Sequence, residues 1–269
     1  MRRGQRRAGS TPRRQTIILG RIAALAVFAC LWELLARANP DLQDSIPAFS
    51  ATVVALFRVL ADPTLWTAAG LTLRSTLLGL GLCVVIGVVA GMMLATHRYF
   101  VSSTRFLIDF CRTVPPLAIL PLFLLLFGPT ARMEILLVVV VGVWPVLLQT
   151  MYGVRGVDPE LLQTARSFRL PRWRRAVFVV GPAAMPYVAT GIRICATLSL
   201  LLAIGSELIA GVPGLGQEIL LSQQAGAAPR MFAQILVTGA IGTALSLTIT
   251  SAERKLLSWH YRPRTAETQ

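Results

Sequence analysis

Charged side chains are scarce in this sequence. Of its 269 residues only 14% are Asp, Glu, Lys or Arg, whereas 55% are hydrophobic. A soluble domain is about a quarter charged, because charged side chains cover its surface. This chain has too few to do so, which indicates a lipid environment. A helix needs roughly 20 apolar residues to cross the hydrocarbon core, and about six such stretches occur here. They leave room for loops but not for a second soluble domain.

Side chains that do catalytic or metal chemistry are also few. The two histidines, His97 and His260, fall outside the apolar stretches, and the four cysteines are isolated from one another. No Cys-x-x-Cys or Cys/His spacing occurs, so we predict no metal site and no catalytic residue, which disfavours a membrane-embedded enzyme. The chain also lacks a Gly-x-x-x-x-Gly-Lys-Ser/Thr loop, so it cannot be an ATPase itself. The cysteines are Cys30, Cys83, Cys111 and Cys195.

Acidic residues are outnumbered by basic ones, 12 to 26, for a formal net charge of +14. The basic residues gather between the apolar stretches and lack the base-stacking aromatics of a nucleic-acid binder, so we expect no nucleic-acid partner. With the N-terminus inside, the inner segments hold 18 Lys and Arg and the outer segments hold 3. This bias predicts that both termini and the loop 153–176 lie in the cytoplasm, with an even number of spans.

The apolar stretches predict an all-α membrane protein. The first is expected to be a retained span, because it is long and lacks a small-x-small cleavage site. The next segment is too polar to span, and its part 51–60 has the apolar periodicity of an interfacial helix. Small residues at 79, 81, 87 and 91 predict close helix packing in the second span. The predicted spans are 16–37, 70–95, 106–127, 134–152, one within 178–210, and 232–252.

This layout divides the chain into four parts. They are a basic cytoplasmic tail (1–15), the first transmembrane helix with a periplasmic interfacial segment (16–66), a five-helix core containing the cytoplasmic loop 153–176 (67–252), and a cytoplasmic C-terminal tail (253–269).

The loop 153–176 carries strong signals for a short helix and a turn. Asp158 is a good N-cap, Pro159 fits the first helical position, and Glu160 favours the positive end of the helix dipole. Pro171 then ends this helix and permits a second one at an angle. We therefore predict a helix–turn–helix at the inner membrane surface.

One face of the predicted helix is apolar. Leu161, Ala165 and Phe168 follow the i, i+4, i+7 spacing of a helical stripe, and arginines surround them. Such a ridge can dock into a groove on a soluble partner, or it can rest on anionic lipid. The residues alone do not decide between the two.

The stretch 158–193 resembles the cytoplasmic EAA loop of binding-protein-dependent ABC importer permeases. Gln163-Thr164-Ala165 stands at the Glu-Ala-Ala position and Arg169 at the glycine position, so the signature Glu and Gly are both lost. Further segments resemble the nitrate/sulfonate/taurine branch of that family, over about residues 45–260. They are Thr72-Leu-Arg-Ser-Thr76, Pro115-Pro-Leu-Ala-Ile-Leu-Pro-Leu122, Phe127-Gly128, Ser206-Glu207, Gly214-Leu-Gly216 and Glu253-Arg254.

The resemblance implies the type I importer fold and a half-transporter with several partners. These are ABC ATPase subunits that bind ATP and Mg²⁺, a second permease copy or paralogue, a periplasmic or lipid-anchored solute-binding protein, and membrane lipid. The chain itself would bind no cofactor. The loop would couple it to the ATPase as a cytoplasmic coupling helix in the bacterial inner membrane. The coupling residues implied are Asp158, Glu160, Leu161, Gln163, Thr164, Ala165, Phe168, Arg169 and Arg174.

Ionisable residues within spans often mark a pathway. Asp109 and Arg112 share a helix face and favour pairing with each other, and Arg193 favours an interhelical partner. Glu207 suits a gating role and a static hydrogen-bonded role equally. Pro115 and Pro116 break the helix, which either leaves backbone carbonyls unbonded and facing a cavity or only bends the helix within the bundle. Glu33 is a further charge in the first span. The candidate pathway residues are Pro115, Pro116, Ser199, Ser206 and Glu207.

A sulfonate-, nitrate- or taurine-like solute is the expected cargo. The alternative is a small ion-coupled transporter or channel without an ATPase partner. Such transporters usually show an internal repeat, which this sequence does not, and the basic loop would then have no role. A scaffold without transport activity is compatible with the composition.

Overall fold

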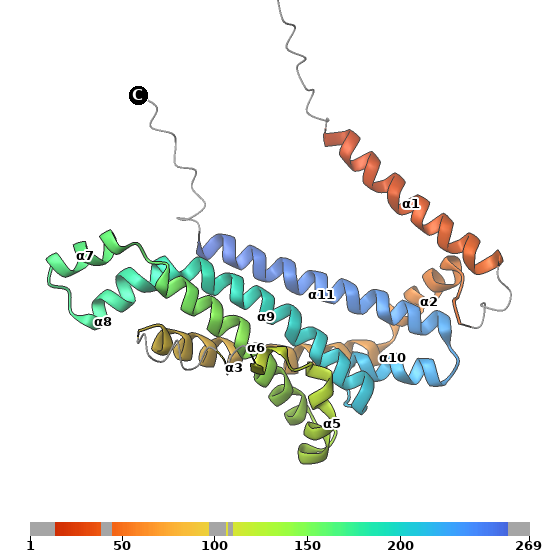
Figure 1. Ribbon diagram of the computed structural model, residues 1–269. Coiled ribbons are helices and arrows are strands. Elements are labelled where there is room, and N and C mark those ends of the chain that lie inside the picture. The colour runs from red at the N-terminus through yellow and green to blue at the C-terminus, as the bar shows by residue number, and fades with distance from the viewer. Residues whose placement is uncertain (1–13, 39–44, 97–105, 107–109, 258–269) are drawn as a thin grey trace, which may run out of the picture.

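The computed structural model describes residues 14–38, 45–96, 106 and 110–257, and all regular structure within them is helical (Figure 1). The helices run between two ends of a bundle. We call these the α7 end, where α7 (Pro159–Ser167) and α8 (Arg172–Arg175) project, and the α10 end, where α2 (Phe49–Ala61) and α10 (Leu215–Gln224) lie.

Four helical stretches of the described chain are long and apolar enough to cross a membrane. They contain α3 (Pro63–Thr96), α6 (Ala131–Arg155), α9 (Gly181–Ala210) and α11 (Ala228–Leu256). A further helix, α1 (Arg14–Ala38), covers the predicted first span, and its 25 residues would reach about 37 Å. The predicted third span is divided: residues 110–113 are helical, the chain bends, and α5 (Pro116–Phe127) follows.

Helices α3 and α6 pack as parallel neighbours through a ladder of small residues. A methyl group added to Gly79 would lie 2.5 Å from Val138, and one added to Gly87 would lie 2.7 Å from Val146. One added to Gly91 would meet Thr150 at 2.8 Å. Each pair is separated by 59 residues, so the two helices run in one direction in constant register. The small face predicted from the sequence is confirmed except at residue 81, which faces open space.

Helix α9 packs against another face of α6 and runs antiparallel to it. Gly142 of α6 lies between the thiols of Cys83 on α3 and Cys195 on α9, which a methyl group there would approach at 2.9 and 3.0 Å. Toward the α7 end, a methyl group added to Gly153 would lie 2.9 Å from the Ala184 carbonyl oxygen. Close backbone approach at small residues is the usual basis of helix association in lipid, so α3, α6 and α9 form the centre of the bundle.

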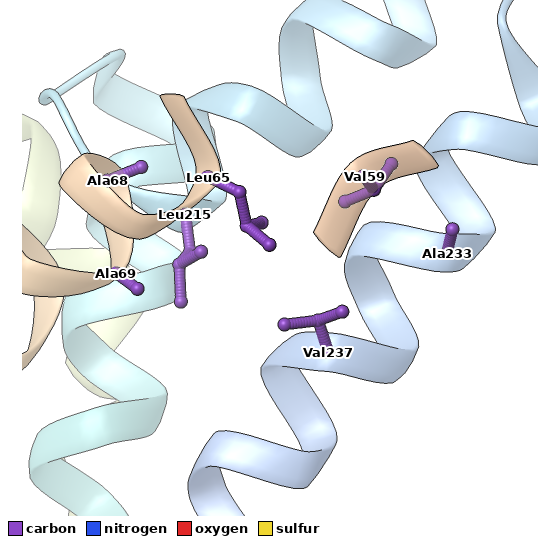
Figure 2. Packing of buried hydrophobic residues seen from close by; sticks show 7 residues of the cluster. All are labelled: Val59, Leu65, Ala68, Ala69, Leu215, Ala233 and Val237. Atoms are coloured by element: carbon purple, nitrogen blue, oxygen red, sulfur yellow. The ribbon is translucent and has the colours of Figure 1, made fainter. Parts of the chain in front are cut away.

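The α10 end is closed by an apolar cluster that joins four helices (Figure 2). Leu65 of α3 and Leu215 of α10 are almost fully buried, and Val237 of α11 and Val59 of α2 complete the contact. The predicted spans leave residues 211–231 without a helix, whereas the structure places α10 within them. That helix contributes Leu215 to the core, so the predicted layout lacked this element.

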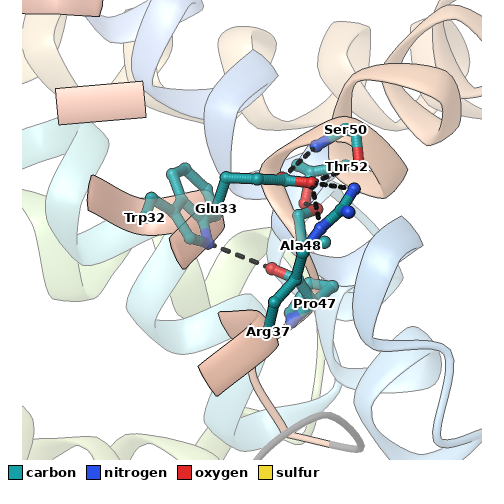
Figure 3. A network of polar contacts seen from close by, with 7 residues as sticks. All are labelled: Trp32, Glu33, Arg37, Pro47, Ala48, Ser50 and Thr52. Atoms are coloured by element: carbon teal, nitrogen blue, oxygen red, sulfur yellow. Dashed lines mark hydrogen bonds and ion pairs between the residues drawn. The ribbon is translucent and has the colours of Figure 1, made fainter. Parts of the chain in front are cut away.

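Helix α1 is attached to the start of α2 by a polar network (Figure 3). The Glu33 carboxylate accepts hydrogen bonds from the amide and hydroxyl of Ser50, each at 2.9 Å, and from Arg37 at 2.7 Å. The Trp32 indole donates to the Pro47 carbonyl at 3.0 Å. Glu33 therefore acts within this described network as an anchor between two helices.

Helix α3 begins seven residues earlier than the predicted second span. The Asp62 carboxylate accepts hydrogen bonds from the Thr64 amide at 3.0 Å and the Thr64 hydroxyl at 2.7 Å, and Pro63 is the first helical residue. This is an N-cap followed by proline, as at Asp158-Pro159. The part of the chain that the sequence assigned to a non-spanning segment thus includes the first turn of α3.

Candidate functional site

The predicted helix–turn–helix of the loop 153–176 is present and is held by its own local contacts. The Asp158 carboxylate accepts a hydrogen bond from the Glu160 amide at 2.9 Å, which caps α7. Pro159 is the first helical residue, and Pro171 is the N-cap of α8. We call residues 158–175 the hairpin. Its helix start and its turn are those that the sequence predicts.

The turn between α7 and α8 is a Schellman motif. The Leu170 amide donates to the Ala165 carbonyl at 3.2 Å, and the Arg169 amide donates to the Arg166 carbonyl at 2.8 Å. Arg169 adopts a left-handed conformation with φ of 49°, and no other described non-glycine residue has a positive φ. Glycine is the usual residue at such a position. The turn is therefore a glycine-type turn that this chain makes with arginine.

The apolar ridge of α7 is only partly exposed. Leu161 is 46% and Phe168 is 77% exposed, but Ala165 is 4% exposed. The chain folds back after the Schellman turn and covers the alanine, so the prediction that all three side chains form one exposed ridge was wrong for Ala165. The exposed surface consists of Leu161 and Phe168.

Polar and cationic side chains surround these two apolar ones. The predicted coupling residues Gln163, Thr164 and Arg174 are exposed on the hairpin. The Arg174 guanidinium lies over the Trp173 ring, 5.1 Å from its centroid, and that ring is 59% exposed. A π-helical turn, Ala176–Val180, then joins the hairpin to α9 without a break. The second helix of the hairpin is therefore continuous with α9.

A second cluster lies at the α10 end and is fully buried. The Glu207 carboxylate accepts a hydrogen bond from the Thr72 hydroxyl at 2.7 Å and one from the Gly216 amide at 2.8 Å. The Thr72 oxygen in turn accepts from the Leu215 amide at 2.9 Å. Side chains on α3 and α9 thus bind the first amides of α10, which satisfies donors that a helix N-terminus leaves open.

Two glycines make room for this cluster. A methyl group added to Gly214 would lie 2.0 Å from the Glu207 carboxylate oxygen. One added to Gly216 would lie 2.4 Å from the Ile204 carbonyl and 2.7 Å from the Glu207 β-carbon. The segment Gly214-Leu-Gly216 therefore fits against α9 only without side chains at both ends. Of the two roles that the sequence left open for Glu207, the described contacts are those of a static hydrogen-bonded group.

Sequence reasoning missed Glu134. This residue of α6 is 1% exposed, and one of its carboxylate oxygens has no hydrogen-bond partner among the described residues. The predicted fourth span began at this residue, so it was treated as a boundary. Thr130, four residues earlier, caps α6 by accepting from the Met133 amide at 3.3 Å, and that signal would have placed Glu134 inside the helix.

The other predicted residues are placed as follows. Ser199 and Ser206 are buried, and their hydroxyls donate to the carbonyls of Cys195 and Ala203. Pro115 and Pro116 stand at the break before α5. Arg193 forms an ion pair with Glu253 of α11, so the predicted interhelical partner is confirmed. Asp109 lies outside the described residues.

Ion pairs also connect the turns at the α10 end. Arg230 lies 3.0 Å from Asp62 and 3.8 Å from Glu218. The Thr64 hydroxyl and amide, and then Arg230, lower the pKa of the Asp62 carboxyl below its ordinary value. Within the described residues no three His, Cys, Asp or Glu side chains are grouped as a metal site.

Comparison with known proteins gives a consistent set of relatives. The family described as binding-protein-dependent transport system inner membrane component matches residues 84–258. The putative aliphatic sulfonates transport permease protein SsuC of Bacillus subtilis is 35% identical over 184 residues, which are 68% of this chain and 65% of the relative. The taurine transport system permease protein TauC of Escherichia coli is 30% identical over 199 residues, 74% of this chain and 72% of the relative. The chain thus spans just under two thirds of the first relative's length.

The fold is also found among solved structures. A chain in the crystal structure of an amino acid ABC transporter with histidines superimposes with a TM-score of 0.61 at 19% identity, and the match covers 76% of this chain and 97% of that one. The helical arrangement is therefore the type I fold of ABC importer permeases, as the sequence predicts.

Proposed function

This chain belongs to the family of binding-protein-dependent transport system inner membrane components, and from that premise we propose that it is the permease subunit of an ATP-driven importer. In this role it forms the membrane pathway and catalyses no reaction. The energy comes from ATP and Mg²⁺ bound by a separate ATPase subunit.

The hairpin is the observation that carries this proposal. It exposes Leu161 and Phe168, and arginine side chains surround them. Exposed aromatic anchors ringed by polar groups are typical of binding hot spots. A movement of the hairpin would pass to the bundle, because α8 continues through Ala176–Val180 into α9. This is the geometry needed for coupling a motor to a pathway.

The partners and location follow from the same role. The ATPase docks on the hairpin in the cytoplasm, which places both termini on that side of the bacterial inner membrane. A second permease copy or paralogue completes the pathway, since α5 and α9 expose large apolar side chains such as Leu125 and Leu201. A solute-binding protein delivers cargo at the α10 end.

The proposed cargo is a small oxyanion of the sulfonate, taurine or nitrate type. The relatives named for aliphatic sulfonates and for taurine share the sulfonate group. These names support a chemical class and not a single compound.

The docking role is tested with Leu161→Asp combined with Phe168→Asp. Loss of a central aromatic anchor typically costs 2 kcal/mol or more, about 30-fold in affinity. We expect the ATPase to be lost on co-purification and ATP-driven uptake into proteoliposomes to cease, while the variant still inserts into membranes. Ala165 is unsuitable for this test because a charge there would be buried in the hairpin.

Ser167→Asp is the matched control, since Ser167 is exposed on the same helix but is not one of the two apolar side chains proposed to dock. It adds one negative charge to the hairpin and should retain most of the ATPase. Normal assembly of the double variant would contradict the docking role. Uptake by the wild-type chain without any ATPase would instead support an ion-coupled transporter.

A further inference from the structure

Arg169 makes the turn of the hairpin in a conformation that is unfavourable for a residue with a β-carbon. Its φ is 49°, and the other described residues with a positive φ are Gly128, Gly211 and Gly226. The glycine of the family signature would make the same turn without that cost. A backbone outlier of this kind is typically retained where the residue serves a function. The function must then lie in the Arg169 side chain.

That side chain has no structural role among the described residues. It is exposed, and its guanidinium forms no hydrogen bond or ion pair with any of them. Neighbouring arginines differ: Arg166 lies in the last turn of α7, where the helix dipole favours a cation, and Arg174 lies over the Trp173 ring. The Arg169 charge is therefore available to a partner outside the chain.

The hairpin is strongly cationic around its exposed aromatic side chain. It carries five arginines and two acidic residues, a net charge of +3, and both acidic residues lie at the start of α7. Arg169 directly follows the exposed Phe168. Both departures from the family signature change the charge in one direction, because Gln163 replaces a glutamate and Arg169 replaces a glycine. The surface that surrounds Phe168 is thus more positive than the signature would make it.

The position of the hairpin favours a soluble partner over a lipid surface. Figure 1 shows α7 and α8 beyond the end of α3 and not along its flank. An exposed aromatic side chain among cations is typical of a protein-binding hot spot. A guanidinium also matches the geometry of a carboxylate, which it binds through two parallel hydrogen bonds.

We infer that Arg169 is a specificity-determining residue of the docking surface, and that the ATPase groove that receives Phe168 carries a carboxylate opposite Arg169. The inference rests on the proposed function and names the chemistry of the partner's surface. Opposite charges across an interface speed association, and like charges reject the wrong partner. The hairpin thus selects an ATPase with an acidic groove among ATPases of similar shape.

The first test measures affinity and its dependence on salt. It uses the full chain in nanodiscs of uncharged phosphatidylcholine and the purified ATPase subunit that co-purifies with wild type. Arg169→Gln is expected to weaken binding about tenfold at low salt, because a charge-assisted contact is lost, and Arg169→Lys to weaken it less. Added salt should weaken binding of wild type more steeply than that of Arg169→Gln. Arg132→Gln is the matched control, since it removes the same charge at the α10 end, where Arg132 lies over Phe127.

Arg169→Gly separates recognition from folding. Glycine suits the left-handed turn, so the hairpin keeps its shape, yet the charge is gone. This variant should bind the ATPase as weakly as Arg169→Gln. A purely structural role would give the reverse result, with binding kept or improved when glycine makes the turn.

A crosslink identifies the group that Arg169 contacts. Lys255 is the single lysine of the sequence, so Lys255→Arg gives a chain without lysine, and Arg169→Lys in that background places one amine at the turn. A zero-length carbodiimide activates a carboxylate, the amine attacks it, and an amide bond forms as the urea leaves. Mass spectrometry should find position 169 joined to an Asp or Glu of the ATPase.

Three outcomes would overturn the inference. They are equal affinity and equal salt dependence for Arg169→Gln and wild type, no crosslink from position 169 to the ATPase, and a defect seen only in nanodiscs of anionic phosphatidylglycerol, which would assign Arg169 to lipid. Failure of the proposed function looks different, because wild type would then bind no ATPase at any salt concentration. Failure of this inference alone leaves wild-type binding intact.

Discussion

The hairpin and the Glu207 cluster lie at opposite ends of the bundle and are stabilised by different kinds of contact. In the hairpin every described cap and turn bond joins residues no more than five apart. In the Glu207 cluster two of the bonds join residues 135 and 143 apart, and the third joins residues nine apart. The hairpin leaves Leu161 and Phe168 exposed, whereas Glu207 and Thr72 are wholly buried. One region keeps its shape without neighbours and can bind a partner, and the other exists only when three helices are assembled.

Gly216→Ala is expected to have the largest effect, and it tests whether the Glu207 cluster depends on the close fit of α10 against α9. The added methyl group would meet the Ile204 carbonyl at 2.4 Å, and that backbone cannot move aside cheaply. Overpacking of this kind costs about 1–3 kcal/mol or more, so we expect a clear drop in melting temperature of the purified chain. Gly239→Ala is the control, since nothing lies within 4 Å of that position. Equal melting temperatures for the two variants would show that α10 does not fit tightly against α9.

The same substitution, glutamate to glutamine, is expected to have opposite effects on stability at Glu207 and at Glu134. Both effects should be smaller than that of Gly216→Ala. Both oxygens of Glu207 accept hydrogen bonds, so Glu207→Gln directs an amide group at a donor and should cost about 1–3 kcal/mol. Glu134 is almost fully buried, and its Oε1 has no hydrogen-bond partner among the described residues. Glu134→Gln replaces this ionisable group by a neutral amide of the same size and should stabilise the chain by about 1 kcal/mol. Chemical denaturation of the matched pair measures both, and shifts of the same sign would contradict the assignment of the two carboxylates.

The smallest expected effect lies in the hairpin. Arg169→Gly relieves the left-handed conformation and should stabilise the turn by about 1 kcal/mol. The change should appear as slower amide exchange in α7, with no change at the α10 end, because the hairpin is locally stabilised. Arg172→Gly removes a similar charge from a position of ordinary conformation and should not slow exchange. A stabilised α10 end in Arg169→Gly would show that the two regions are coupled.

This contrast also explains what the sequence could predict. The hairpin is encoded by residues close together, so Asp158, Pro159 and Pro171 were enough to predict it. The spans were predicted because apolar length is likewise local. Asp62-Pro63 carries the same capping signal, which would have placed the start of α3 correctly.

The α10 end could not be predicted in the same way. Leu215–Gln224 has a mixed composition, and its first amides are bound by Thr72 and Glu207, which are remote in sequence. Burial of Ala165 depends likewise on the chain folding back after the turn. Such features arise only when helices that are remote in sequence pack together, so they cannot be predicted from the periodicity or spacing of residues along the chain.

The constant 59-residue register of α3 and α6 has one more consequence. Small side chains recur on α3 every four residues, at Gly79, Cys83, Gly87 and Gly91, so sliding one helix past the other by a single turn would again bring small residues opposite larger ones. Sterics alone therefore permit more than one alignment. The Thr72 hydroxyl fixes the position of α3 relative to α9 and α10, because it bonds to both Glu207 and the Leu215 amide. Since α9 also packs closely against α6 at Gly142 and Gly153, this bond sets the α3–α6 alignment indirectly, through the third helix.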